Sequence, residues 1–238
     1  MYGLGTLLNV AAIVAGGLLG LCAGRFFKPS WQTGLTRVMG LCCVFVAVGG
    51  FLEASVTVTP EGGVALGGMM PAILSFALGT LLGEMADIQA RVEAVGEALR
   101  RKASRAEDAR FVDAFVTASL TVSVGAMAVI GALDDALKAD ITVLTVKSLM
   151  DFVIVAVMAS AMGKGAVFSA LSVLAVQGTV TLFAFAIAPV MTPEALKFVA
   201  ITGSMMIFCI GVNLFSPGTF RVANMLPALV FAVLFSYF

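Results

Sequence analysis

The chain has 238 residues, of which 61% are hydrophobic and 12% are charged, which is about half the charged fraction of an ordinary soluble domain and excludes a soluble globular protein. The 14 basic and 14 acidic side chains cancel, which excludes the basic surface that binds nucleic acid. The chain has no histidine and no metal-type spacing among its four cysteines, so we expect no metal site, no cofactor and no enzyme activity.

Hydrophobic segments long enough to cross a bilayer recur along the chain. A spanning helix needs about 20 apolar residues, and eight segments reach or approach that length. The expected spans are Leu4–Gly24, Gly34–Leu52, Val64–Met85, Phe111–Leu133, Ile141–Met162, Ala166–Pro189, Leu196–Phe215 and Val222–Phe238. The second and the eighth are close to the short limit, so seven spans is the alternative. The sequence therefore predicts an all-α polytopic membrane protein with about eight transmembrane helices.

The basic residues between the spans predict the orientation, because Lys and Arg collect in cytoplasmic loops. With the N-terminus outside, the outer loops hold only Lys138 and Lys197, and Lys147 falls within a span. The inner loops then hold Arg25, Lys28, Arg37, Arg91, Arg100, Arg101, Lys102, Arg105, Arg110, Lys164 and Arg221. We therefore expect both termini outside. No basic residue precedes the first apolar segment, which predicts an uncleaved first span rather than a signal peptide.

One polar segment, residues 87–110, interrupts the apolar chain. It carries many of the charges and places Ile88, Val92, Val95 and Leu99 at helical spacing, which predicts an amphipathic helix on the cytoplasmic side. This helix is either a membrane-surface linker between two halves of the protein or a docking helix for a soluble partner.

The first and last thirds of the chain resemble each other. Residues 68–77 align without a gap with residues 224–233, and the spans before them match with one residue of slippage. Five crossings separate corresponding helices, so the predicted repeat is inverted, which is typical of secondary transporters. We expect a first three-span unit over 1–86, two central spans over 111–163 and a second three-span unit over 164–238.

Pro71 and Pro227 occupy matching positions of this alignment. Proline lacks a backbone N–H and frees a carbonyl in the preceding turn. Paired helix breaks in the two halves of a membrane protein typically mark a binding site, and a simple packing kink is the alternative.

The fifth span contains the strongest chemical signal. Lys147 and Asp151 are four residues apart on one helical face, with Ser148 beside them. A charge at the centre of a span costs about 2.5–3.5 kcal/mol even on the mild scale of membrane insertion, so such residues face the protein interior or a water-filled path. The pair is either part of a substrate- or ion-binding site or a structural ion pair.

Other polar residues extend this candidate site. Asn9 and Gln177, in the first spans of the two units, occupy roughly corresponding places, and Asn213 lies in the seventh span. Asp134 and Asp135 lie at the outer end of the fourth span, as an acidic entrance or as solvated loop residues. Each neutral group by itself is more often a contact between helices, whereas together they could line a site.

Glycines repeat at every fourth residue in two of the spans. The repeats are Gly16, Gly20 and Gly24 in the first span and Gly79 and Gly83 in the third. Small residues at this spacing let helix backbones approach closely in lipid. They predict either packing within the chain or the interface of a homodimer.

Four elements carry a resemblance to a known family: Gly125–Gly131, Asp134-Asp135, Lys147-Ser148-x-x-Asp151 and Gln177-Gly178. Together with the glycines of the first span, they are similar to the YqgA/YdfK-like bacterial membrane proteins, a domain-of-unknown-function family, over the whole chain. The resemblance implies a bacterial inner-membrane protein of a family often labelled as possible transporters, and it supplies no substrate. The family commonly has glycine after this aspartate, where this chain has Phe152.

These features predict a secondary transporter or permease for a small solute or ion, with its binding site near the bilayer midplane and the lipid bilayer around it. A passive channel and an envelope scaffold without flux are the alternatives. The chain has no Gly-rich phosphate-binding loop, so we expect no nucleotide-driven transport within it.

Overall fold

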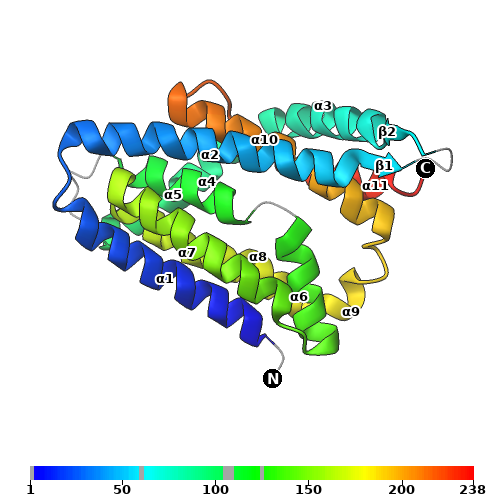
Figure 1. Cartoon of the computed structure of the whole chain (residues 1–238), viewed down its shortest axis with the longest axis horizontal. Coiled ribbons are helices and arrows are strands. Elements are labelled where there is room, and N and C mark those ends of the chain that lie inside the picture. Colours follow the sequence, from blue (N-terminus) through cyan, green and yellow to red (C-terminus); the bar gives the residue numbers. More distant parts are fainter. Residues whose placement is uncertain (1–2, 59–61, 104–109, 124–125) are drawn as a thin grey trace.

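The computed structural model describes residues 3–58, 62–103, 110–123 and 126–238, which form a bundle of helices with a small hairpin at one end (Figure 1). The elements are α1 (Leu4–Gly24), α2 (Pro29–Ser55), β1 (Val56–Val58), β2 (Val64–Leu66), α3 (Met69–Ala86), α4 (Ile88–Ala103), α5 (Phe111–Ser123), α6 (Ala126–Lys138), α7 (Thr142–Met162), the 3-10 helix η1 (Lys164–Phe168), α8 (Ser169–Leu182), α9 (Ala184–Ile187), α10 (Pro193–Phe215), the 3-10 helix η2 (Val222–Met225) and α11 (Pro227–Phe235).

The described chain contains six helices that are long and apolar enough to cross a membrane. They are Leu4–Gly24, Ser30–Ser55, Met69–Ala86, Thr142–Met162, Lys164–Leu182 and Pro193–Phe215. Helices α5 and α6 qualify together as a seventh span that is bent by 60° between them, and Val222–Phe235 is a shorter apolar helix. The all-α polytopic fold is therefore confirmed, with the expected fourth span divided into two half-helices and the expected eighth span short.

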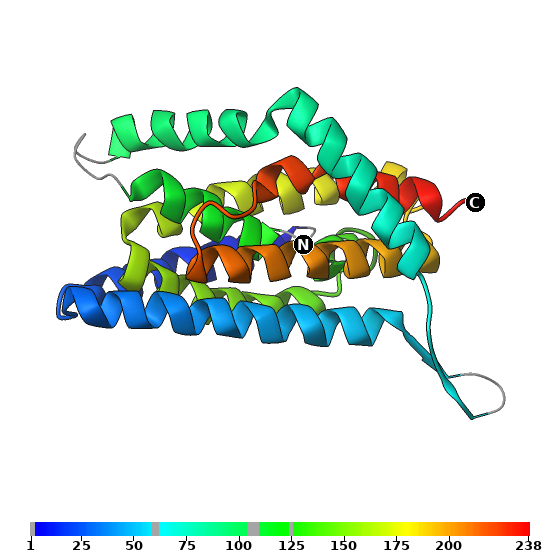
Figure 2. The same cartoon turned by 90° about the horizontal axis from the view of Figure 1, so that it is seen from above.

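The second and third spans differ from their predicted bounds. α2 has 27 residues, or about 40 Å of helix, because polar residues such as Gln32 and Thr36 continue the helix before its apolar part. Val64, the predicted start of the third span, instead belongs to the antiparallel hairpin of β1 and β2, which projects from the bundle (Figure 2). The left-handed conformation of Gly68, with φ at 82°, then turns the chain into α3.

The glycine repeat of the first span brings α1 against α7. A Cβ atom at Gly16 would lie 2.3 Å from the carbonyl oxygen of Phe152, and a Cβ at Gly20 would lie 2.0 Å from that of Ala156. The contacts advance in the same direction along both helices, so α1 and α7 are parallel. Of the two alternatives for this repeat, packing within the chain is the one that the structure contains.

Three further helix pairs are antiparallel. In the pairing of α1 with the η1–α8 segment, Gly17 approaches Val167 of η1, and the hydroxyl groups of Thr6 and Thr181 lie 3.3 Å apart. Contacts between glycines and facing residues establish the other two pairs. These contacts are Gly40 with Gly211 and Gly50 with Ser204 between α2 and α10, and Gly79 with Ala228 and Gly83 with Asn224 between α3 and the η2–α11 segment. Each pair therefore joins a helix of residues 1–86 to a helix of residues 164–238.

The amphipathic segment forms α4, which lies against the protein rather than apart from it. Val92 and Leu99 pack on a buried cluster that includes Phe111 and Phe115 of α5, whereas Val95 is exposed. Part of the apolar face of this helix is therefore covered by the chain itself.

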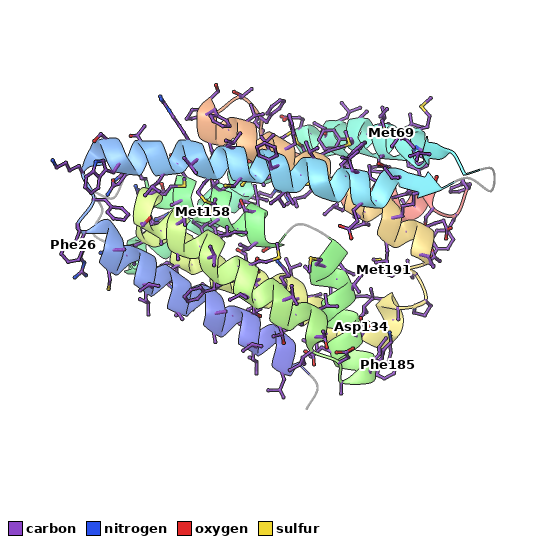
Figure 3. All side chains as sticks on the ribbon, viewed as in Figure 1. Phe26, Met69, Asp134, Met158, Phe185 and Met191 are labelled. Carbon is purple, nitrogen blue, oxygen red and sulfur yellow. The ribbon has the colours of Figure 1, made fainter. Side chains whose placement is uncertain are left out.

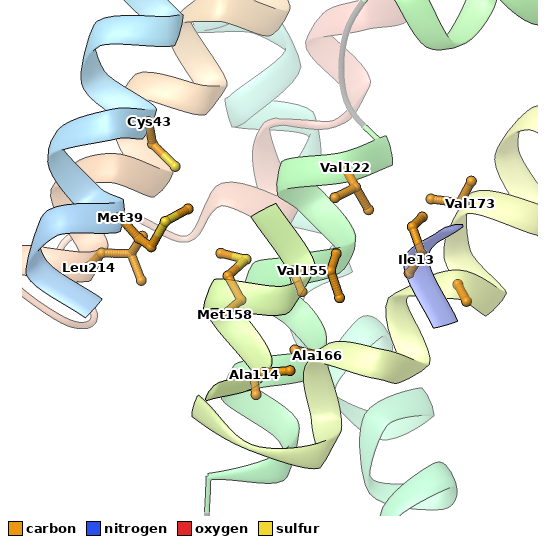
Figure 4. Packing of buried hydrophobic residues seen from close by; sticks show 13 residues of the cluster. Ile13, Met39, Cys43, Ala114, Val122, Val155, Met158, Ala166, Val173 and Leu214 are labelled. Atoms are coloured by element: carbon orange, nitrogen blue, oxygen red, sulfur yellow. The ribbon is translucent and has the colours of Figure 1, made fainter. Parts of the chain in front are cut away.

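Large apolar side chains cover the outside of the bundle (Figure 3). Phe26 and Phe185 are more than 80% exposed, which is unfavourable in water and expected in contact with lipid tails. The interior contains a cluster of buried hydrophobic residues in which α1, α2, α5, α7, α8 and α10 meet (Figure 4). The arrangement is that of a protein whose surrounding solvent is the lipid bilayer.

Candidate functional site

The break between α5 and α6 creates a helix end inside the bundle. α5 ends at Ser123, and α6 continues the span at 60° to it. The last carbonyl groups of a helix have no partner within the helix and carry the negative end of its dipole. The carbonyl oxygen of Val122 is one of these groups, and it accepts a 2.8 Å hydrogen bond from Lys147 Nζ.

Lys147 and Asp151 form a buried ion pair one turn apart on α7. Lys147 Nζ lies 3.0 Å from Oδ1 and 2.9 Å from Oδ2 of Asp151, and the two residues are 8% and 2% exposed. Ser148, beside them in the sequence, donates its hydroxyl hydrogen bond to the carbonyl of Leu144 within the same helix. The structure therefore joins the two charged residues and leaves the Ser148 hydroxyl occupied by its own helix.

Asn9 reaches the same carboxylate from α1. Its Nδ2 donates a 2.9 Å hydrogen bond to Asp151 Oδ2, and the residue is fully buried. Its other amide atom, Oδ1, has no hydrogen-bond partner among the described residues. Because a buried polar atom without a partner is costly, this oxygen is available for a ligand or a water molecule.

Gln177 lies in the same layer of the bundle, on α8. The antiparallel register that pairs Thr6 with Thr181 places Gln177 at the level of Asn9. Ser119 and Ser172 are joined by a 2.8 Å hydrogen bond between the parallel helices α5 and α8, so the next turns bring Ser123 and Gln177 to one level. Gln177 is fully buried, and neither its amide atoms nor the Ser123 hydroxyl has a partner in the described chain.

An apolar layer lies directly beneath these polar groups. Ile13, Val155 and Val173 are one turn from Asn9, Asp151 and Gln177 respectively, on the same side of the layer, since α8 runs opposite to α1 and α7. All three are fully buried and pack together with the side chain of Val122 (Figure 4). We refer to Asn9, Ser123, Lys147, Asp151, Gln177 and the Val122 carbonyl as the central cluster.

The two aspartates at the far end of α6 lie outside the central cluster. Asp135 is fully buried, and its carboxylate accepts hydrogen bonds from the backbone N–H groups of Gly3 at 3.2 Å and Gly5 at 2.9 Å. Asp134 pairs with the exposed side chain of Lys138 at 2.7 Å. Asp135 thus caps the start of α1, about one helical turn before Asn9.

Replacing Asp135 by alanine is expected to lower the free energy of unfolding by about 1–2 kcal/mol, because the first N–H groups of α1 lose a buried acceptor. The melting temperature of the purified protein checks this. Asp134→Ala is the matched control, since it removes an adjacent carboxylate that pairs only at the surface. Equal melting temperatures for the two variants would contradict the capping role.

Asn213 and the two prolines also lie outside the central cluster. The Asn213 side chain binds both backbone groups of Phe220, at 2.7 and 2.9 Å, and so holds the loop before η2. Pro71 and Pro227 lie in the first turns of α3 and α11, where a missing N–H costs no helical hydrogen bond. Neither proline interrupts the α-helix that contains it, although Pro227 follows directly on the 3-10 helix η2; the bend within a candidate span lies between α5 and α6.

A cavity with a mixed polar and apolar lining lies at the end of the bundle that carries α4. This cavity has a volume of about 450 Å³, and its polar lining includes Gln89, Glu93, Asp113, Thr117 and Asn213. Helix α5 connects it to the central cluster, since the same helix lines the cavity and then supplies the carbonyl that holds the lysine. Asp113 and Thr117 of α5 line the cavity, and Val122 of the central cluster follows later on the same helix.

One fully buried residue that the sequence analysis missed joins α4 to the membrane helices. The side-chain oxygen of Asn224 accepts a 2.6 Å hydrogen bond from the backbone N–H of Gln89, and Gln89 Oε1 accepts one from Ala223 N at 3.2 Å. The sequence offered one signal, an asparagine near the start of the apolar last span.

The fold and the central cluster define a class: a polytopic helical membrane protein with a buried charged pair at the end of a discontinuous helix. The chain belongs to the family described as "Protein of unknown function (DUF554)", whose model matches residues 4–237. It is similar to "Uncharacterized membrane protein YdfK" of Bacillus subtilis (strain 168), with 25% identity over 226 residues, 95% of this chain and 92% of the relative.

A second relative is "Uncharacterized protein YqgA" of Escherichia coli (strain K12), with 24% identity over 235 residues, 97% of this chain and 94% of the relative. No solved structure matches the chain significantly. The resemblance expected from the sequence is therefore confirmed. The description of YdfK as a membrane protein agrees with the long apolar helices of this chain.

Proposed function

We propose that this protein is a secondary transporter or permease for a small solute or ion, and that the central cluster is its binding site. The observation that carries the proposal is the contact between Lys147, Asp151 and the Val122 carbonyl at the end of half-helix α5. Interrupted helices within a membrane are tolerated where they line a cavity or protein, and in transporters their ends form the sites for ions and substrates.

The antiparallel pairing of helices supports an inverted repeat over residues 1–86 and 164–238. In the proposed repeat, α1, α2 and α3 correspond to α8, α10 and α11, and each of these helices contacts its own counterpart in the opposite direction. This is the relation that a two-fold axis in the membrane plane produces. Two related units of opposite orientation give two near-equivalent conformations, each open to one side.

The cavity beside α4 supports a route between the site and one side of the membrane. With both termini outside the bacterial inner membrane, as the basic residues indicate, α4 and the cavity face the cytoplasm. In the described conformation the apolar layer of Ile13, Val155 and Val173 lies on one side of the polar groups. A rocking movement of the two units would separate this layer and admit the substrate.

Cysteine accessibility tests the proposal without knowledge of the substrate. In a chain whose four cysteines are replaced by alanine, Gln177→Cys is expected to react with a membrane-impermeant thiol reagent in right-side-out and in inside-out vesicles. Each conformation of a transporter exposes the site to one side. Met206→Cys, equally buried but within an apolar cluster on α10, is the matched control and is expected to react slowly from both sides.

If Gln177→Cys reacts no faster than Met206→Cys from either side, the transport proposal is wrong and an envelope scaffold becomes the better description. A linear, non-saturating current in a planar bilayer would instead favour a passive channel.

A further inference from the structure

The hydrogen bonds of the Lys147 ammonium decide which charge the central cluster can accept. An ammonium group has three donors and no acceptor. Lys147 Nζ contacts three oxygen atoms, the Val122 carbonyl and both carboxylate oxygens of Asp151, at 2.8 to 3.0 Å. Its donors are therefore occupied within the protein, and none remains for an anionic ligand.

The unpartnered groups around the pair are mostly oxygen atoms. Among the described residues of the cluster, three oxygens (Asn9 Oδ1, Gln177 Oε1 and Ser123 Oγ) and one nitrogen (Gln177 Nε2) are buried without a hydrogen-bond partner. The helix registers place them at the level of the Asp151 carboxylate and the Val122 carbonyl. The negative end of the α5 dipole points toward the same place. Carboxylate, amide, hydroxyl and carbonyl oxygens together are the ligands that hard metal cations prefer.

The charge balance selects a monovalent cation. Asp151 is the only carboxylate in the cluster, and the ammonium of Lys147 neutralises it. A metal ion beside an ammonium that stays in place would leave excess positive charge in a medium of low dielectric constant, where such charge is costly. A monovalent cation that takes the place of the ammonium restores neutrality. A proton on Asp151 would leave the three unpartnered oxygens unsatisfied.

We propose that the central cluster binds an alkali-metal cation at the position that the Lys147 ammonium occupies. This inference rests on the proposed transport function, and Na⁺ is the probe that tests it. Lys147 is then a tethered competitor: its flexible chain lets the ammonium leave when the ion binds and return when the ion departs. The returning ammonium neutralises Asp151, so the ion-free protein changes conformation without an unpaired buried carboxylate.

The melting temperature of the full-length purified protein tests this proposal. It is measured at one pH over a series of NaCl concentrations, with N-methyl-D-glucamine chloride keeping the ionic strength constant. An ion that binds the folded state raises the melting temperature in a saturable way. We expect such a rise for the wild type, and no rise for Asp151→Asn, in which the carboxylate charge is lost.

Two further variants keep the test decisive if Asp151→Asn folds poorly. Lys147→Gln removes the competitor, so the half-saturating Na⁺ concentration should fall by at least about tenfold, because less of the protein is held in a state that cannot bind. Asp134→Asn removes a carboxylate at the surface and is expected to leave the Na⁺ response unchanged. LiCl and KCl, used in the same way, report the selectivity among alkali ions.

Equal melting temperatures of the wild type in Na⁺ and N-methyl-D-glucamine would overturn the ion site, as would an unchanged half-saturating concentration in Lys147→Gln. This outcome is distinguishable from failure of the transport proposal. If Gln177→Cys is labelled from both sides but Na⁺ has no effect, the protein transports a substrate other than an alkali ion. If Na⁺ raises the melting temperature but Gln177→Cys is not labelled, the protein binds the ion without transporting it.

Discussion

Lys147→Met is expected to lower the free energy of unfolding by about 3–5 kcal/mol, because it leaves Asp151 buried without its cation. Asp151→Leu should cost a similar amount, since the ammonium then keeps only the Val122 carbonyl as a partner. The double variant, with Met and Leu together, should recover most of this loss, because well-packed apolar groups replace a buried pair at little cost. Melting temperatures in N-methyl-D-glucamine chloride, without alkali ions, measure all three.

Lys138→Met is the matched control for this series, since Lys138 also pairs with an aspartate four residues away but is exposed at the surface. Its effect should be small, as is usual for exposed ion pairs. Single variants of the buried pair that melt no lower than this control would contradict the assigned burial. The double variant also separates function from stability: it should fold, yet lose the Na⁺ response and any transport.

The chemistry of the site could be predicted from the sequence, but its assembly could not. The spacing of Lys147 and Asp151 places both on one face of a helix, and the cost of charge in a membrane predicts that they are paired. Asn9 joins them from 142 residues away. Its place depends on which helix the glycines of α1 contact, and glycine spacing predicts a close approach without naming the partner.

The broken span was missed because hydropathy does not distinguish one straight helix from two half-helices. Both α5 and α6 are apolar, and the prolines predicted helix breaks at α3 and α11 instead. A usable signal was present in the hydroxyl residues Thr117, Ser119, Thr121 and Ser123, followed by Gly125. In the structure, the Thr121 hydroxyl donates a hydrogen bond to the carbonyl of Thr117. The Ser123 hydroxyl has no hydrogen-bond partner among the described residues.

The inverted repeat stays a prediction, whereas several predicted boundaries differ from the structure. The internal similarity of the chain led to the expectation of opposed units, and the antiparallel pairs are compatible with it. The hairpin of Val56–Val58 and Val64–Leu66 was missed because its second strand looks like the start of an apolar helix. The β-branched residues Val56 and Thr57 favour the first strand. Gly67 and Gly68 separate the second strand from α3.

Gly20→Val is expected to prevent correct folding, because the added side chain would meet the backbone of α7 rather than a movable side chain. A Cβ atom at Gly20 would lie 2.0 Å from the carbonyl oxygen and 2.8 Å from the carbonyl carbon of Ala156. The neighbouring contacts at Gly16 and Gly24 also involve backbone atoms of α7, so the helices cannot accommodate valine locally. The cost should exceed the range of about 1–3 kcal/mol that is typical of overpacked cores.

Gly49→Val is the matched control, since a Cβ atom at Gly49 would have no neighbour within 4 Å although the residue also lies in a long apolar helix. It should leave the yield and melting temperature close to those of the wild type. A well-folded Gly20→Val protein would mean that α1 and α7 pack less closely than described. In that case α1 would not hold Asn9 against Asp151 as described, and the proposed Na⁺ site would lose this amide. A change that separates α1 from α7 is therefore expected to abolish the proposed ion site as well.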